Sequence, residues 1–191
     1  MKFLLKENQL NDLRKTLSHS IEDYGIYETL KRYNLNLKSL SAIFKGEKLP
    51  DISCADLYDI VLKSKIFKRD LNWANAVIYK DYKFIFTHDE FGGSVFFKCR
   101  ELNSPENETL DGYATPYWDG NCYLPIDFEY YTWIDSDGNV NDEDITGEYY
   151  YSEDVPEEFN SFNDIDKWVN TEYLRILSEK CEEVFNYIRE S

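Results

Sequence analysis

Apolar residues in the first third of the chain recur with the spacing of one helix face. Leu10, Leu13 and Leu17 share a face of a helix over residues 7–17, and the same spacing continues over residues 24–33. This pattern predicts two helices that bury their apolar faces against neighbouring elements.

Capping residues and helix breakers divide the segment that follows. Asn36 can cap a third helix, which Gly46 would end. Pro50 then interrupts the chain, and Ser53 can cap a fourth helix. Together these signals predict a helical bundle over residues 1–70.

From residue 75 onward, apolar residues form short runs that are typical of strands. Polar segments separate these runs, and Asp119-Gly120-Asn121 gives a strong signal for a tight turn. The predicted strands cover residues 76–79, 84–86, 95–97, 113–118, 122–126, 128–134 and 148–151. The other predicted turns and loops cover residues 80–83, 103–111, 135–139 and 155–162.

The last element is the clearest helix, because one apolar stripe runs from Ile165 to Ile188. We expect this helix, over residues 164–190, to pack on one face of the sheet. The order of elements predicts an α+β fold, in which an N-terminal helical bundle precedes a mostly antiparallel β-sheet packed by the long C-terminal helix. The chain accordingly divides into a helical head (residues 1–70) and an acidic body (residues 71–191).

Charge is distributed unevenly between these two parts. The head has 13 Lys and Arg against 10 Asp and Glu, whereas the body has 8 against 27, and the net charge of the chain is −16. Between Arg100 and Lys167 there is no basic residue, but there are 19 carboxylates and 13 aromatic residues. Because aromatic residues bury large apolar areas, we expect this stretch to fold and not to form a disordered tail. A folded surface of one sign attracts cationic partners and repels nucleic acid and anionic membranes.

The four cysteines, Cys54, Cys99, Cys122 and Cys181, lie far apart and lack the paired spacing of a zinc site. Apolar neighbours predict that Cys99 and Cys181 are buried thiols. The N-terminal apolar run is too short for a signal peptide, and no stretch approaches the roughly 18 apolar residues of a membrane span. A reducing cytosol is the simplest compartment for such a chain, so we expect a cytoplasmic protein.

Residues 24–66 resemble the helix-turn-helix of phage-repressor-type regulators. In that family a turn residue ends one helix, and an apolar residue, a capping residue and the recognition helix follow. The matching positions are Asn34, Leu35, Asn36, Leu40, Ile43, Gly46, Glu47 and Pro50. The resemblance implies DNA contacts from Lys38, Ser39, Ser41 and Lys45.

This segment departs from the family pattern in the donors that it offers to DNA. Base edges and phosphates are read by hydrogen-bond donors, and arginine is prominent among them. The only cations of the expected recognition helix are Lys38 and Lys45, and it has no arginine. A helical bundle with the same local topology and no DNA contact is therefore the alternative.

The segment from Asp135 to Asp144 resembles the later part of an EF-hand or dockerin calcium loop, with the spacing D-x-D-G-x-x-N-x-x-D. Calcium takes six to eight oxygen ligands, and such loops supply them at alternating positions. Here the first ligand position falls on Trp133, which has no oxygen to offer. A hairpin turn is the simpler interpretation, and calcium binding by the acidic cluster is left open.

Nothing in the sequence points to an enzyme. His19 and His88 are far apart, and no nucleophile elbow, phosphate-binding loop or dinucleotide-binding motif is present. With 37 carboxylates in the chain, some pair will always look catalytic, so a pair alone is uninformative. We expect a protein with no enzymatic activity, no metal and no cofactor.

In charge and size the chain is similar to phage-encoded nucleic-acid mimics, such as anti-restriction and anti-CRISPR proteins. The start, Met1 to Leu10, also looks like that of many small phage accessory proteins. The similarity implies an inhibitor in the host cytoplasm whose acidic face blocks a basic nucleic-acid enzyme. An immunity protein that neutralises a nuclease toxin fits the same physics.

We expect two acidic clusters to form the partner-binding face. The first consists of Asp135, Asp137, Asp142, Glu143 and Asp144, and the second of Glu153, Asp154, Glu157 and Glu158. The alternative is an acidic surface that only keeps the protein soluble.

Two further alternatives concern the whole molecule. A regulator would read DNA with its head and use its acidic body for dimerisation or ligand binding, whereas a scaffold component would form ordered multimers. The sequence leaves the target, the oligomeric state and the continuity of the acidic face open.

Overall fold

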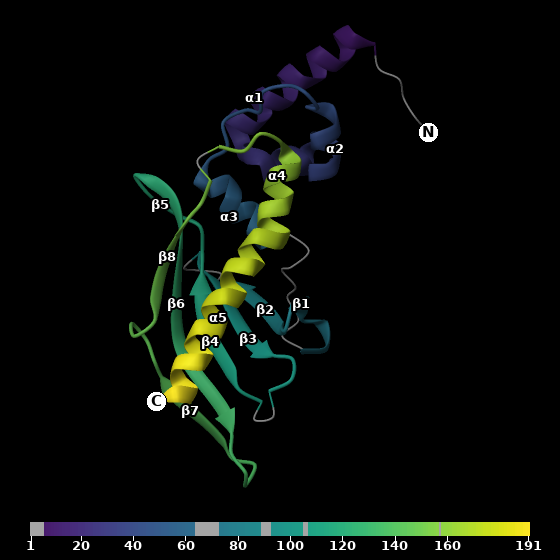
Figure 1. The fold of residues 1–191 in the computed structure, drawn as a ribbon. Coiled ribbons are helices and arrows are strands. Elements are labelled where there is room, and N and C mark those ends of the chain that lie inside the picture. Colours follow the sequence, from purple (N-terminus) through teal and green to yellow (C-terminus); the bar gives the residue numbers. More distant parts are fainter. Residues whose placement is uncertain (1–5, 64–72, 89–92, 105–106, 157) are drawn as a thin grey trace.

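The structure, a computed structural model, describes residues 6–63, 73–88, 93–104, 107–156 and 158–191. It has the α+β fold that the sequence predicts (Figure 1). The helical head lies at one end of the molecule, and an antiparallel sheet extends away from it. One long C-terminal helix crosses a face of this sheet and reaches the head.

The head contains α1 (Glu7–Arg32), α2 (Leu37–Ile43) and α3 (Cys54–Lys63). Helix α1 is broken at Gly25, whose φ of 80° leaves the helical region. At this break the amide of Ile26 donates to Asp56 Oδ1 at 2.8 Å, and Asp56 Oδ2 accepts from the hydroxyl of Ser53 at 2.7 Å. Asp56 therefore fixes the broken helix α1 to the start of α3. A Cβ atom at Gly25 would lie 2.9 Å from Asp56 Oδ1, so this position requires glycine.

The turn between α1 and α2 has the turn and capping residues that the sequence predicts. Asn34 adopts a φ of 51°, and Asn36 caps α2 by accepting a hydrogen bond from the amide of Ser39 at 2.8 Å. Gly46 has a φ of 82° just beyond α2. The local turn chemistry was therefore read correctly from the sequence, although residues 64–66 of the resembling segment lie outside the described residues.

The sheet is an antiparallel meander, preceded by the short helix η1 (Trp73–Asn75). Its strands are β1 (Val77–Tyr79), β2 (Tyr82–His88), β3 (Val95–Glu101), β4 (Thr109–Ala114), β5 (Tyr117–Asp119), β6 (Asn121–Ile134), β7 (Val140–Asp144) and β8 (Tyr150–Asp154). Strands β4 and β5 pair with one edge of β6, with a register shift between Asp111 and Gly112, and β7 and β8 pair with its other edge. The long strand β6 is thus the centre of the acidic part of the sheet.

Several predicted strand boundaries were wrong. The charged residue Asp127 does not end a strand, because it lies between Ile126 and Phe128 in one continuous β6. Thr109 to Asp111 belong to β4 and not to a loop, and only Lys80 and Asp81 form the turn between β1 and β2. Strand β7 was not predicted, since its residues are polar and acidic.

The C-terminal helix runs continuously through α4 (Phe162–Lys167), the π-helical turn η2 (Trp168–Glu172) and α5 (Tyr173–Glu190). Tyr173 is fully buried, and its hydroxyl donates to the carbonyl oxygen of Ala114 at 2.7 Å. The Phe185 ring stacks on Tyr82 of β2. These contacts confirm that the long helix packs on one face of the sheet.

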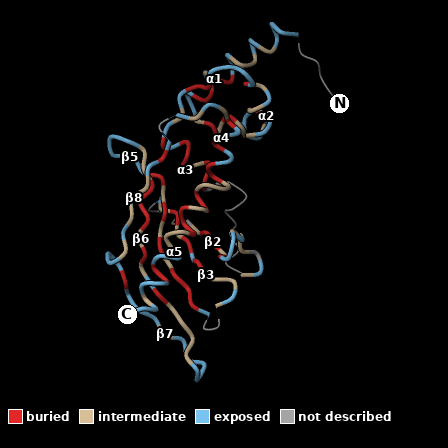
Figure 2. The backbone as a smooth tube through the Cα atoms, in the orientation of Figure 1, coloured by how far each residue is buried: buried red, intermediate tan, exposed pale blue. Residues whose placement is uncertain are grey.

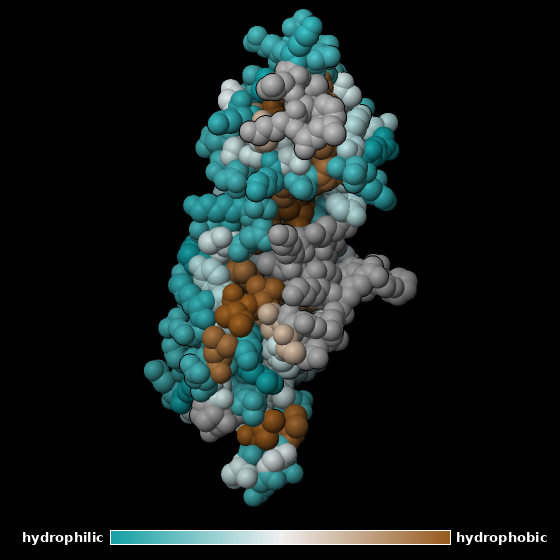
Figure 3. All heavy atoms as spheres, turned by 90° about the vertical axis from the view of Figure 1, so that its right-hand side faces the viewer, coloured by the Kyte–Doolittle hydropathy of each residue, from teal (hydrophilic) through white to brown (hydrophobic). Residues whose placement is uncertain are grey.

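One buried core connects the head with the sheet. Figure 2 shows buried backbone continuing from α3 through the C-terminal helix into the central strands. The side of the molecule seen in Figure 3 is mostly hydrophilic, with small separate hydrophobic patches. Among the described residues, no helix combines the length and apolarity that a membrane crossing requires.

Cys54 of α3 and Cys122 of β6 form a disulfide with a Cα–Cα distance of 5.4 Å. The sequence did not predict this pair, because the two cysteines lie 68 positions apart and meet only in the fold. Cys99 and Cys181 are buried free thiols, as predicted. Disulfides persist in oxidising surroundings, so the reducing cytosol expected from the sequence stays a prediction.

Candidate partner-binding face

The side of the sheet opposite α5, which we call the open face, carries most of the exposed tyrosines of the acidic stretch. Side chains alternate along each strand, so residues between the buried ones point to this side. No described helix covers the open face over β4, β6, β7 and β8. Tyr117, Tyr130 and Tyr150 are 55%, 43% and 52% exposed there.

Cross-strand pairing arranges the open face in rows. Directly opposed residues in an antiparallel pair share a face, and neighbouring strands lie about 4.8 Å apart. One row contains Phe96, Tyr113, Asp127 and Tyr150, and the next contains Lys98, Asp111, Tyr130 and Asp144. Two outer rows contain Tyr117, Tyr123 and Asp154 at one end, and Thr109, Thr132 and Asp142 at the other. Tyrosines and carboxylates are therefore interleaved across the strands.

A β-bulge adds a further carboxylate to this arrangement. Gly112 pairs with Phe128 and Asp111 pairs with Tyr130, so Glu129 is the extra residue of β6. Burial and the nearby charges of Asp127, Asp111 and Asp144 raise the pKa of Glu129. Like charges thus meet at the centre of the open face.

Few cations offset these carboxylates. Lys98 makes an ion pair with Asp111. The second carboxylate oxygen of Asp111 and one oxygen of Asp127 are buried and accept no hydrogen bond from any described residue. Buried acceptors without donors are costly, so these two oxygens lower the stability of the open face.

The structure divides the predicted acidic residues between two faces. Asp142, Asp144 and Asp154 lie on the open face. Glu143 pairs with the buried Tyr131, and Glu153 makes an ion pair with Lys180 of α5 at 3.1 Å, so both lie on the helix-covered side. Glu158 is exposed in the loop after β8, and Glu157 lies outside the described residues.

Asp135 and Asp137 belong to the tight turn between β6 and β7. Asp135 Oδ1 accepts hydrogen bonds from the backbone amides of Asn139 and Asp137, each at 2.9 Å. These hydrogen bonds, together with those from the side chains of Asn139 and Asn141, lower the pKa of Asp135. The segment is a hairpin turn in which Asp135 stabilises the backbone. Among the described residues, no group of three or more His, Cys, Asp or Glu side chains is arranged to hold a metal ion.

Sequence reasoning missed three carboxylates of the open face, namely Asp111, Asp127 and Glu129. The signal was present in the alternation of β6, where Ile126 and Phe128 flank Asp127. Reading the acidic residues by runs of charge favoured the hairpin and the loop instead. The strand period places Asp127 between two buried residues, whereas the position of Glu129 depends on the bulge, which only the cross-strand register shows.

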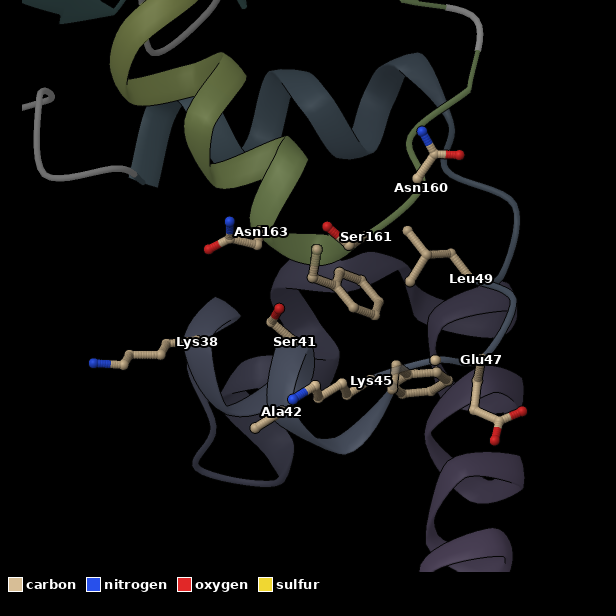
Figure 4. A pocket seen from close by; sticks show the side chains of 12 residues that line it. Lys38, Ser41, Ala42, Lys45, Glu47, Leu49, Asn160, Ser161 and Asn163 are labelled. Carbon is tan, nitrogen blue, oxygen red and sulfur yellow. The ribbon is translucent and has the colours of Figure 1, made fainter.

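The residues expected to contact DNA lie on or next to α2. Helix α4 begins directly against α2, where Phe44 and Phe162 pack edge to face with ring centroids 5.4 Å apart. A pocket of about 640 Å³ lies beside this contact, and Ser41 lines it together with Ser161 and Asn163 (Figure 4). The side of α2 at Ser41 therefore faces α4.

Lys38 and Lys45 also line this pocket, and both are exposed. The side chain of Lys38 points away from α4 in Figure 4. The hydroxyl of Ser39 donates to Asn36 Oδ1 at 3.0 Å and reinforces the cap of α2. Arg14 of α1 donates to the carbonyl oxygen of Ile43 at 2.7 Å and closes the other end of the helix. Lys38 is the exposed cation of α2, a helix of seven residues, and a single cation supplies few of the donors that recognition of DNA bases requires.

Neither a protein-family model, nor a curated protein, nor a solved structure matches this chain at a significant level.

Proposed function

We propose that this protein is a non-enzymatic binder whose open face occupies the nucleic-acid groove of a basic protein. The single observation that carries the proposal is the interleaving of tyrosines with Asp111, Asp127, Glu129 and Asp144 on a sheet face that no described helix covers over β4, β6, β7 and β8. Such a face presents fixed negative charge to a cationic groove. It also presents ring surfaces to the arginines that such grooves contain.

The charges of the open face are spaced more widely than the phosphates of DNA. One step between strands is about 4.8 Å, and Asp111 and Asp144 lie two steps apart, about 9.6 Å, with Tyr130 between them. Phosphates follow one another about every 3.4 Å along each strand of duplex DNA, so the charge along this row is about threefold less dense. A rigid sheet holds these charges in place without the entropy cost of ordering a tail.

Aromatic rings close to arginine occur within the molecule itself. The guanidinium of Arg32 lies 3.6 Å from the centroid of the Tyr24 ring, and that of Arg100 lies 4.5 Å from the Trp73 ring. Tyr130 and Tyr150 offer the same ring surface with carboxylates beside them. A partner rich in arginine would use both features at once.

The physiological setting that fits this chemistry is inhibition of a host defence nuclease by a phage-type inhibitor. Neutralisation of a nuclease toxin by an immunity protein requires the same surface. Both roles place the protein against a basic nucleic-acid enzyme, and neither requires a catalytic residue.

The test is a competition assay. Purified basic nucleases are screened for loss of DNA cleavage when the protein is added, and the association rate with any inhibited nuclease is then measured across a salt series. The triple variant Asp127→Asn/Glu129→Gln/Asp144→Asn should lower the association rate about tenfold. A matched variant on exposed positions of α1, Asp12→Asn/Glu22→Gln/Asp23→Asn, removes the same charge elsewhere and should leave the rate nearly unchanged.

Two results would count against the proposal. Inhibition that is independent of salt would exclude an electrostatic face. An equal loss of rate in both triple variants would show that total charge matters and that the open face does not.

A helix-turn-helix regulator is the second candidate, because the turn at Asn34 and the cap at Asn36 have the local geometry of that motif. In this case the protein should shift a DNA fragment at moderate salt. Lys38→Glu should abolish the shift, whereas Lys15→Glu, an exposed control on α1, should not. Failure of the wild-type protein to retain any DNA would remove this candidate.

A further inference from the structure

An apolar groove lies at the junction of the head and the sheet, away from the centre of the open face. Its walls come from the start of α3, from the hairpin between β5 and β6, and from the loop after β8 (Figure 1). Ile52, Leu57, Trp118, Val155 and Phe159 supply the apolar lining. The disulfide between Cys54 and Cys122 joins two of these walls, so the groove is covalently framed. We call this site the junction groove.

The junction groove is large enough for a side chain and is open to a partner. Its volume is about 720 Å³, and Trp118 in its wall is 62% exposed. An exposed tryptophan beside an apolar hollow is the residue type that most often dominates the binding energy of an interface. The groove therefore has the form of a receptor for an apolar anchor.

Charge identifies the partner that the groove would accept. Among the described residues, no charged side chain lines the groove, and the exposed carboxylates Asp51, Asp119, Asp154 and Glu158 each directly adjoin a lining residue in the chain. Adjacent Cα atoms lie about 3.8 Å apart, so these charges are within one Debye length of the groove. No Lys or Arg directly adjoins a lining residue.

We propose that the junction groove binds a basic protein segment that inserts one apolar side chain between flanking lysines or arginines. This inference shares one premise with the proposed function, namely that the partner is a basic protein. The open face supplies the long-range attraction, and the groove supplies an anchor that salt does not weaken. A second copy of this chain is a poor occupant, because its net charge of −16 would be repelled.

The experiment compares two labelled peptides by fluorescence anisotropy at low salt. Both consist of arginine and serine with equal charge, and one carries a leucine in place of its central serine. The wild-type protein should bind the leucine peptide about tenfold more tightly, because the leucine becomes buried. Trp118→Ala and Ala55→Arg should both reduce this preference to nearly one.

Ala55 is an exposed lining residue near the start of α3, so Ala55→Arg alters the groove with little effect on folding. Ala42→Arg, at an exposed position of α2, is the matched control and should keep the preference. The open-face triple variant should weaken both peptides equally and also keep the preference. Failure of that variant to weaken either peptide, with the preference intact, would reject the proposed function and leave the groove standing.

Three outcomes would overturn the inference. The wild-type protein could bind both peptides equally, or the preference could survive both groove variants. Alternatively, sedimentation could show a dimer that Ala55→Arg dissociates and Ala42→Arg does not. This last result would assign the groove to a second copy of the chain.

Discussion

The two faces of β6 differ in what their side chains contribute. Leu124, Ile126 and Phe128 are fully buried under the C-terminal helix, whereas the intervening Asp127 and the bulge residue Glu129 lie on the open face. One strand therefore contributes both to the core and to the candidate site, with a period of two residues. The comparison shows that the acidic residues of the open face can vary in charge without altering the residues that hold the fold.

The electrostatics of the two faces are opposite as well. On the covered side Glu108 is buried and accepts hydrogen bonds from Tyr131 at 2.6 Å, from Ser104 at 3.2 Å and from Arg189. Burial raises the pKa of Glu108, but these hydrogen bonds outweigh burial and lower it overall. On the open face the pKa of Glu129 is raised, because burial and neighbouring carboxylates act in the same direction. The covered side thus satisfies its carboxylate with hydrogen-bond donors, whereas the open face brings like charges together.

The largest expected effect comes from a matched pair of truncations on β6. Phe128→Ala removes a fully buried ring and should lower the free energy of unfolding by about 3–5 kcal/mol. Tyr130→Ala removes an exposed ring from the open face and should cost about 1 kcal/mol or less. Urea unfolding of both variants measures the difference. Equal losses would show that the open face is part of the stabilising core.

The disulfide gives the next largest effect, at the junction between the head and the sheet. Cys54→Ser/Cys122→Ser should lower the free energy of unfolding by about 2–4 kcal/mol, because the cross-link closes a long loop. A reducing agent should lower the melting temperature of the wild-type protein and leave that of the double variant unchanged. If the reducing agent leaves the melting temperature of the wild-type protein unchanged, Cys54 and Cys122 do not form a disulfide in solution.

Helical periodicity predicted the head and the C-terminal helix well, because local signals determine both. Asn36 and Ser53 cap α2 and α3 as expected, and the stripe from Ile165 to Ile188 belongs to one continuous helix. These elements depend on spacing and capping within a few residues, which a single sequence displays directly.

Features formed by distant segments could not be read in the same way. The pairing of β7 with β6 overrides the low strand propensity of Asp142, Glu143 and Asp144. The disulfide joins residues that only the packing of α3 on the β5–β6 hairpin brings together. The rows of the open face depend on cross-strand register, including the bulge at Glu129, and a run of charges along the sequence does not reveal register.

Glu108 provides a prediction for the covered side. The pKa of Glu108 is lower in the folded protein than in the unfolded chain, where it is about 4.3. The ionised carboxylate therefore stabilises the fold above that pH, and this stabilisation is lost as the pH falls through the pKa of the folded protein. Glu108→Gln should cost about 1–3 kcal/mol at neutral pH. The difference between wild type and variant should shrink in urea titrations below about pH 4. A difference that is constant with pH would assign the loss to packing alone.

The smallest effect, on the open face, has the opposite sign. The pKa of Glu129 is raised in the folded protein, so ionisation of this carboxyl group opposes folding. Stability is therefore lost as the pH rises from the pKa of the unfolded chain, about 4.3, through the higher pKa of the folded protein. Glu129→Gln removes this repulsion and should raise the free energy of unfolding at neutral pH by about 0.2–1 kcal/mol. The gain should be absent below about pH 4 and should diminish with salt, whereas Glu22→Gln, at an exposed position of α1, is the control and should produce no gain at neutral pH. Loss of stability in Glu129→Gln would mean that the carboxylates of the open face are already paired, and the face would then have no unmet charge to offer a basic partner.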